Sequence, residues 1–334
     1  MPVVELNLTR IKKLVSGNVT KKRIVDTLPF LGLDIESQDD DKIRIEYSPN
    51  RPDYSTDFGI AIGLEGLLGI KKGIQKISIK KHGNFEIKVD PSVSKIRPFV
   101  TGIIARSGII DDETIKQLMN MQEDLHFGIG RKRKKSSIGL HDLDKISFPL
   151  NYTTATREHS FVPLNSESKN TVDQILSETE VGKNYGWVLG DSKSVPIIVD
   201  SEGKTISFPP IINASVTTVT TKTKNMLVEV TSLDKNAAED MLSVVVAILQ
   251  KAGFEIIELK ISGKNNSTPT LNPKVIQYDV KLTEDILGLN LSPSAMISSL
   301  KKCRLNAIQK GKKIQCTIPR HRFDIFGPMD IVEE

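Results

Sequence analysis

Apolar residues recur along this chain at both helical and alternating spacings, which predicts a mixture of short helices and strands. The first helix ends near Val15, with Asn7 or Thr9 as its expected cap, and Thr20 is the expected cap of the second. The N-terminal module, residues 1–84, is predicted to contain that first helix, a second helix over 21–33, strands over 33–37 and 42–47, an apolar helix over 60–68 and a lysine-rich linker over 70–83.

The central module, residues 85–265, mixes strand patterns with two longer helical patterns, which is typical of a mixed α/β or α+β domain. A polar run from Lys264 to Pro269 is its expected exit linker. The predicted strands cover 85–90, 100–105, 194–200, 204–208, 226–231 and 254–261, and the predicted helices cover 112–129 and 235–253.

The third module, residues 266–334, carries a strand pattern over 275–280 and a short helix expected to begin at Thr283. Ser292 followed by Pro293 predicts a cap and first turn for a helix ending at Lys302. Two strands over 304–309 and 313–318 follow, which suggests a winged-helix-like module. The expected fold class is therefore α+β in several domains.

Bulk composition narrows the class of protein. Hydrophobic content of 38% with 26% charged residues describes a soluble globular protein, and 334 residues suffice for two or three domains. A net charge of +5 is compatible with RNA contact without requiring it. Cys303 and Cys316 are in no metal spacing, there is no signal peptide, and no apolar run suits a membrane span. These features favour a cytoplasmic protein without membrane contact.

Four carboxylates crowd the last eleven residues. If Pro328 begins a helix, then Asp330, Glu333 and Glu334 share one face, and Asp324 lies just upstream. Converging carboxylate oxygens are typical Mg²⁺ ligands. The alternative is an acidic, solvated helix start that is stabilised by the helix dipole. A helix that ends one turn after it begins also suggests a longer native chain.

Three further stretches carry candidate chemistry. The basic run 130–135 suits RNA phosphates or a solvated loop, and it lacks the Gly-Lys-Ser/Thr of a P-loop. His141 with Asp142 and Asp144 could bind a metal, but no other histidine stands in ligand spacing with it, so His141 is expected to be structural. Glu229 and Thr231 alternate with Val230 and so share one side of a strand, which is either a site near Pro209–Asn213 or an exposed polar face.

The order and spacing of these motifs give the chain a family resemblance. It resembles, along its whole length, the β subunit of the archaeal and eukaryotic cytosolic type of phenylalanyl-tRNA synthetase. The motifs that carry the resemblance are Ser48–Asp53, Gly130–Lys135, Ile138–Asp144, Pro209–Asn213, Arg322–Ile325 and Asp330–Glu334.

The resemblance implies that aminoacylation and editing take place on different subunits. The α subunit of such an enzyme uses ATP to charge tRNA(Phe), and the intact enzyme holds two α and two β chains. The central β domain hydrolyses tyrosine that was wrongly attached to the same tRNA. The implied editing pocket contains Ile198 as an apolar wall, with Ser207, Glu229 and Thr231 as hydrogen-bonding groups, and we expect Glu229 to accept the tyrosine hydroxyl.

The resemblance also implies a Mg²⁺ site at Asp324, Asp330, Glu333 and Glu334 in the intact enzyme. A later catalytic-like module is missing, so the chain resembles an N-terminal fragment, and we expect it to bind Mg²⁺ weakly or not at all. Two other functions stay open: a free-standing deacylase of mischarged tRNA, and a non-catalytic tRNA-binding or assembly module.

Overall fold

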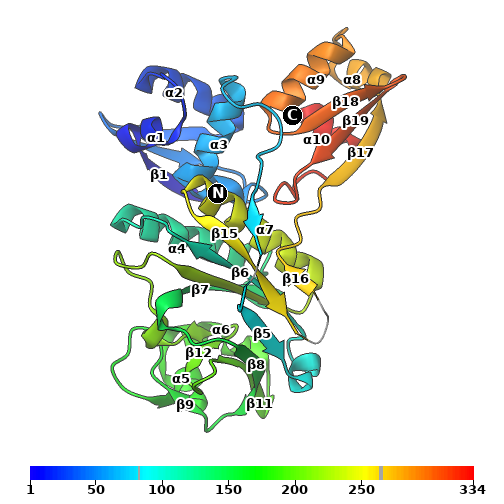
Figure 1. Ribbon diagram of the computed structural model, residues 1–334. Coiled ribbons are helices and arrows are strands. Elements are labelled where there is room, and N and C mark those ends of the chain that lie inside the picture. The colour runs from blue at the N-terminus through cyan, green and yellow to red at the C-terminus, as the bar shows by residue number, and fades with distance from the viewer. Residues whose placement is uncertain (82, 263–265) are drawn as a thin grey trace. The chain divides into compact units, whose positions relative to one another are not determined.

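The computed structural model describes residues 1–81, 83–262 and 266–334 (Figure 1). Contacts divide the chain into two compact units, residues 1–77 with 271–334 and residues 78–270. The first and third predicted modules thus join in one unit, although most of the second unit separates them in sequence. Within the described residues, no helix is both long and apolar enough to cross a membrane. The predicted α+β fold class is confirmed.

The N-terminal part of the first unit is a three-stranded antiparallel sheet, with strand order β1-β3-β2, and three helices. Asn7 caps the first helix and Thr20 caps the second, because each side chain accepts a hydrogen bond from the amide three residues on. The pattern missed the first strand. The elements are β1 (Val3–Asn7), α1 (Leu8–Leu14), α2 (Lys21–Thr27), β2 (Asp34–Gln38), β3 (Lys42–Glu46) and α3 (Asp57–Leu67).

The C-terminal part of the same unit packs three helices on a three-stranded sheet of order β17-β19-β18. Ser292 caps α9 as predicted, whereas the helix expected from Thr283 begins at Val280, because Asp279 caps it. The elements are β17 (Lys274–Asp279), α8 (Val280–Leu287), α9 (Pro293–Lys302), β18 (Asn306–Lys310), β19 (Lys313–Ile318) and α10 (Pro328–Glu333).

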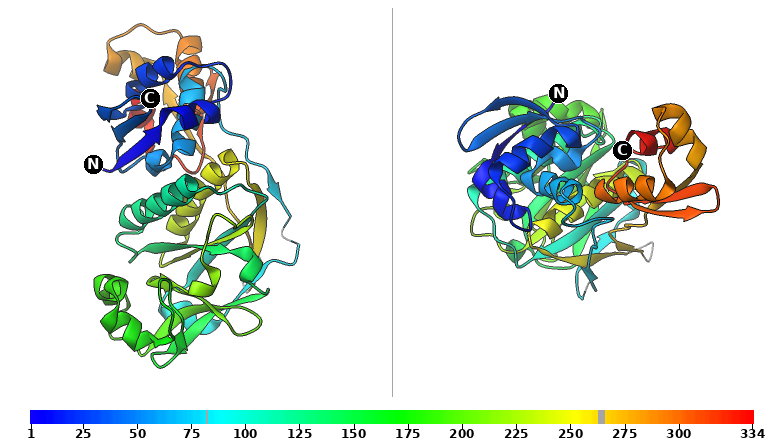
Figure 2. Two further views of the ribbon diagram at one scale, coloured as in Figure 1. Left: turned by 90° about the vertical axis from the view of Figure 1, so that its left-hand side faces the viewer. Right: turned by 90° about the horizontal axis from the view of Figure 1, so that it is seen from above.

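A large mixed sheet organises the second unit, with strand order β13-β12-β11-β8-β5-β15-β6-β14-β7. Two long helices, α4 (Asp112–Phe127) and α7 (Lys235–Lys251), lie side by side on one face of its β15-β6-β14-β7 part (Figures 1 and 2). The apolar run of α7 is buried against these strands. The strands are β5 (Glu86–Val89), β6 (Phe99–Arg106), β7 (Ser136–Asp142), β8 (Leu150–Thr156), β11 (Ser194–Val199), β12 (Thr205–Phe208), β13 (Ile212–Asn213), β14 (Met226–Ser232) and β15 (Glu255–Ile261).

Smaller elements complete the second unit, and two of them replace predicted linkers. Residues Ile79–Lys80 form β4 and residues Asn266–Thr268 form β16, and both strands pair with β15. The predicted linkers are therefore partly extensions of the sheet, while His82, Lys264 and Asn265 lie outside the described residues. The remaining elements are β9 (Ser160–Phe161), β10 (Asn170–Thr171), α5 (Val172–Glu178) and α6 (Glu180–Tyr185).

Candidate functional site

A cavity of about 680 Å³ opens in the second unit, which is a size typical of small-molecule sites. Its walls come from α4, from the basic turn after it, from the loop before β10 and from α6. The floor includes Ser207 of β12, Asn213 of β13 and Glu229 of β14. Sequence-distant strands thus bring two of the predicted pocket residues, Ser207 and Glu229, together beside Asn213.

The floor of the cavity holds more hydrogen-bond acceptors than donors. The Ser207 hydroxyl lies 3.0 Å from Glu229 Oε1 and 3.2 Å from Asn213 Oδ1, yet it has one proton to donate. The Asn213 amide donates to the Leu140 carbonyl at 3.3 Å. Glu229 is 2% exposed, and its Oε2 has no hydrogen-bond partner among the described residues. The site therefore lacks a donor that a ligand hydroxyl would supply.

Gly139 makes room for this cluster. It pairs with Glu229 across β7 and β14. A Cβ at position 139 would lie 2.6 Å from Glu229 Oε1, 2.6 Å from His141 Nε2 and 3.1 Å from Asn213 Oδ1. Real Cβ atoms essentially never approach other atoms this closely, so a side chain at position 139 would force the Glu229 and His141 side chains to move.

His141 lies directly behind Glu229. It is fully buried, and its Nδ1 is 2.9 Å from the Thr217 hydroxyl, as the structural interpretation expects. Its Nε2 is 3.7 Å from Glu229 Oε1 and has no hydrogen-bond partner among the described residues. The imidazole therefore also contributes an unsatisfied polar atom next to the cavity floor, a role that sequence spacing did not indicate.

Thr231 and Ile198, the other two predicted pocket residues, stand apart from the cavity lining. Thr231 is fully buried on the same side of β14 as Glu229, which excludes the exposed-face alternative for this strand. Its hydroxyl accepts a hydrogen bond from Arg97 at 2.8 Å. Ile198 pairs with Ser207 across β11 and β12 and is buried in the sheet core. Their predicted pocket roles stay predictions.

Arg97 is a buried cation that sequence reasoning missed. Its guanidinium donates to the Thr231 carbonyl at 2.8 Å, to the Lys134 carbonyl at 3.0 Å and to the Arg133 carbonyl at 3.3 Å. Burial lowers the pKa of Arg97 to about 10. The pairing of Arg97 with β14 joins residues 134 positions apart, which no local pattern reveals.

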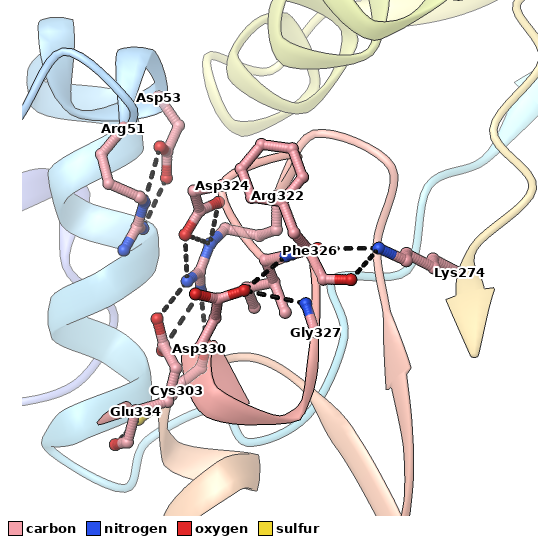
Figure 3. A network of polar contacts seen from close by, with 11 residues as sticks. Arg51, Asp53, Lys274, Cys303, Arg322, Asp324, Phe326, Gly327, Asp330 and Glu334 are labelled. Carbon is pink, nitrogen blue, oxygen red and sulfur yellow. Dashed lines mark hydrogen bonds and ion pairs between the residues drawn. The ribbon is translucent and has the colours of Figure 1, made fainter. Parts of the chain in front are cut away.

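Two of the C-terminal carboxylates of the first unit, Asp324 and Glu334, lie beside Arg322 (Figure 3). Arg322 makes two bonds to Asp324, at 2.9 and 2.7 Å, and it also pairs with Glu334. Burial opposes the charge of Arg322, but these ion pairs outweigh it and raise the pKa of Arg322. Two of the four predicted metal ligands therefore already have a cationic partner.

The other two carboxylates do not complete a metal site. Asp330 Oδ2 accepts the amides of Phe326 and Gly327 at 2.7 and 2.8 Å, and these bonds hold the pKa of Asp330 below its usual range. Glu333 lines a cavity of about 360 Å³ beside Asp324 and Glu334. Among the residues that the structure describes, no group of three or more His, Cys, Asp or Glu side chains is arranged to hold a metal ion. The quartet as arranged does not fit Mg²⁺.

Two family models match the chain. Residues 104–242 match the B3/4 domain, and residues 276–334 match the tRNA synthetase B5 domain. A phenylalanine–tRNA ligase beta subunit from Archaeoglobus fulgidus is 39% identical over 335 residues, covering 100% of this chain and 61% of the relative. Another, from Methanocaldococcus jannaschii, is 36% identical over 100% of this chain and 62% of the relative.

A solved structure is similar throughout. It is the crystal structure of an N-terminal fragment of the phenylalanyl-tRNA synthetase beta-subunit from Pyrococcus horikoshii, with a TM-score of 0.92 and 28% identity, and the match covers 99% of this chain and 98% of that one. The chain is thus similar along its whole length to phenylalanine–tRNA ligase beta subunits. It spans about three fifths of the length of the curated relatives it matches.

The two family models assign the two clusters to different domains. Ile198, Ser207, Glu229 and Thr231 all fall in the B3/4 match. The carboxylate quartet falls in the B5 match. The cavity floor is thus a feature of the B3/4 domain, and the Arg322 ion pairs belong to the B5 domain.

Proposed function

We propose that this chain serves in phenylalanine–tRNA ligase as the beta subunit and hydrolyses mischarged Tyr-tRNA(Phe) in the cavity of its second unit. Similarity to such beta subunits over the whole chain supports the subunit assignment. The alpha subunit, which we expect to bind ATP and charge tRNA(Phe), would be its partner in an assembly of two alpha and two beta chains. Mg²⁺ at the carboxylate quartet is proposed only for that intact enzyme, because the quartet does not fit the ion here.

The missing hydrogen-bond donor on the cavity floor carries this proposal. Glu229, Ser207 and Asn213 present acceptors that the described residues do not fully satisfy. A tyrosine hydroxyl supplies one proton to such a site, whereas phenylalanine would leave a buried acceptor unpaired. Sites built to bind a hydroxyl reject the analogue that lacks it by 10⁴-fold or more, while apolar pockets reject an added hydroxyl by only about 10². An editing site of this kind removes the tyrosine that an apolar aminoacylation site fails to reject.

The histidine of the cavity lining is not free to act as the base for the hydrolytic water. His126 lines the cavity, but its Nδ1 is 3.2 Å from Glu123, and its Nε2 accepts the Ile138 amide at 2.9 Å. Burial lowers the pKa of His126, which favours the neutral ring. We therefore propose that the pocket orients the ester and that the terminal ribose of the tRNA helps to position the water.

A deacylation assay on the purified chain tests the proposal. We expect hydrolysis of Tyr-tRNA(Phe) and retention of Phe-tRNA(Phe). A Glu229→Gln protein should be slower by roughly 10²-fold in kcat/KM, because the amide replaces one carboxylate acceptor with an N–H donor and removes the charge that strengthens the bond to the tyrosine hydroxyl. Glu258→Gln in β15 makes the same chemical change outside the cavity and should leave the rate unchanged. A normal rate for Glu229→Gln would exclude the assigned role.

The same assay separates the alternatives. A chain that hydrolyses Tyr-tRNA(Phe) equally well with and without the alpha subunit would act as a free-standing deacylase. A chain that binds tRNA but hydrolyses nothing under either condition would be a non-catalytic tRNA-binding or assembly module. The unsatisfied acceptors on the cavity floor favour a hydrolytic site over a non-catalytic tRNA-binding or assembly module.

A further inference from the structure

A left-handed turn follows α4. Arg131, Lys132 and Arg133 have φ values of 48°, 54° and 67°. Each non-glycine residue in this region costs roughly 1–2 kcal/mol, so three in succession are unusual. Such strain persists where the surrounding structure imposes it, and it often accompanies ligand contact.

Buried contacts hold the turn from inside. The Arg133 guanidinium donates to the Ile211 carbonyl at 2.8 Å and to Glu123 at 2.7 Å, and it lies 4.3 Å from the Tyr185 ring centre. The Arg97 guanidinium fixes the carbonyls of Arg133 and Lys134 from the other side. Because Arg133 and Tyr185 also line the cavity, the turn is anchored to its wall.

The outer face of the turn carries cations that are not neutralised. Arg131, Lys132 and Lys134 are exposed, and none of them forms an ion pair within the described residues. Two aromatic rings lie beside them. Lys132 is 5.7 Å from the ring centre of Phe127, and Lys134 is 6.0 Å from that of Trp187.

Both rings are open to solvent, since Phe127 is 68% exposed and Trp187 is 55% exposed. Cations interleaved with exposed aromatic rings are typical of surfaces that bind single-stranded nucleic acid, because phosphates pair with the cations and bases stack on the rings. An anionic membrane would neutralise the cations equally well, but it would not need flat stacking platforms beside a polar cavity.

We propose that Arg131, Lys132, Lys134, Phe127 and Trp187, together the basic–aromatic face, bind the single-stranded 3′ end of a tRNA. The cations contact its phosphates, and a base stacks on Trp187. The choice of tRNA as ligand rests on the proposed editing function. The face would hold the 3′ end at the wall of the cavity in which the ester is hydrolysed.

Binding of uncharged RNA tests this face without relying on hydrolysis. The probe is a fluorescent acceptor-stem hairpin with a single-stranded CCA end, titrated by anisotropy into the full 334-residue chain. The variant Arg131→Ala/Lys132→Ala/Lys134→Ala should bind roughly tenfold more weakly, and the slope of log K against log salt should fall by about 2. The matched control Lys95→Ala/Lys145→Ala/Lys193→Ala removes equal charge from exposed sites elsewhere on the unit and should bind normally.

Trp187 gives a second readout, since it is the only tryptophan in the chain. Stacking of a base should quench its fluorescence, with the same midpoint as the anisotropy titration, and Trp187→Ala should weaken binding about five- to tenfold.

Several outcomes would overturn the proposal: equal binding by the triple variant and its control, an unchanged Trp187 signal on binding, equal affinity for a blunt hairpin, or tighter binding to phosphatidylserine vesicles. If the face binds RNA as expected but Tyr-tRNA(Phe) is not hydrolysed, the proposed editing function fails while this binding site stands.

Discussion

Two buried polar clusters, one in each unit, differ in how their hydrogen-bonding groups are satisfied. In the first unit, Arg322 lies between Asp324 and Glu334, and its guanidinium bonds to both carboxylates. In the second unit, Glu229 and His141 each keep one polar atom without a hydrogen-bond partner among the described residues. The Arg322 cluster is satisfied by its own ion pairs, whereas the Glu229 cluster keeps polar atoms without a partner among the described residues.

Whether a buried polar cluster is satisfied within the chain distinguishes a structural cluster from a candidate binding site better than the residue types in it do. Buried polar groups are normally satisfied, because an unpaired one costs about 1–3 kcal/mol. A cluster that meets this requirement internally stabilises the fold and has little left to offer a ligand. A cluster with unpaired polar atoms gains free energy when a ligand supplies the missing hydrogen bonds. The carboxylate quartet, for which the family resemblance implied a Mg²⁺ site, belongs to the first kind.

Removing the centre of the satisfied cluster should give the largest effect. Arg322→Ala leaves Asp324 and Glu334 without their cation, which should cost about 3–5 kcal/mol of unfolding free energy. Chemical denaturation of the first unit measures the loss, and Tyr-tRNA(Phe) hydrolysis by the folded variant should be unchanged. A loss of less than about 1 kcal/mol would show that the Arg322 ion pairs do not stabilise the first unit as proposed.

Acid should weaken the same unit. His321 is buried beside Arg51 and Arg322, and burial lowers its pKa to about 4. Above pH 6.5 the His321 side chain is neutral in both the folded and the unfolded chain. Below pH 6.5 it becomes protonated in the unfolded chain but stays neutral in the folded one. Stability should therefore fall by about 2 kcal/mol between pH 6.5 and pH 5. A His321→Asn protein, compared over the same pH range, should lack this part of the slope, and parallel curves would contradict the assignment.

Neutralising the unsatisfied carboxyl should change stability little. Glu229→Gln keeps the shape of the side chain and removes a group whose Oε2 has no hydrogen-bond partner among the described residues. The unfolding free energy should stay within about 1 kcal/mol of that of the unchanged chain. The rate of Tyr-tRNA(Phe) hydrolysis should still fall by roughly 10²-fold. Thermal or urea denaturation measures this, and a loss of 3 kcal/mol or more would place Glu229 in the same class as Arg322.

Magnesium should have the smallest effect. With Asp324 and Glu334 paired to Arg322, the isolated chain should gain less than about 0.5 kcal/mol from roughly 5 mM Mg²⁺. Denaturation midpoints in MgCl₂ and in NaCl of equal ionic strength test this. Tight, stoichiometric binding in a calorimetric titration would mean that the quartet releases Arg322 to form a metal site.

Local structure was largely predictable where local rules decide it. Asn7, Thr20 and Ser292 cap helices at the expected positions, because capping depends on residues within one turn. The start of α8 was misplaced, since Asp279 caps it ahead of Thr283. Strands β4 and β16 were missed because a few residues become a strand only when a partner such as β15 is available.

By itself, the sequence determined the fold class, most element positions, the family resemblance and the shared face of Glu229 and Thr231, because these follow from residue order and period. Only the tertiary structure placed Gly139, Ser207 and Asn213 around Glu229 and set Arg322 among the carboxylates. It also imposed a left-handed turn on Arg131–Arg133 that local preference opposes. Whether a buried group finds a partner depends on residues far away in sequence, and pairing across a sheet decides which of those residues arrive.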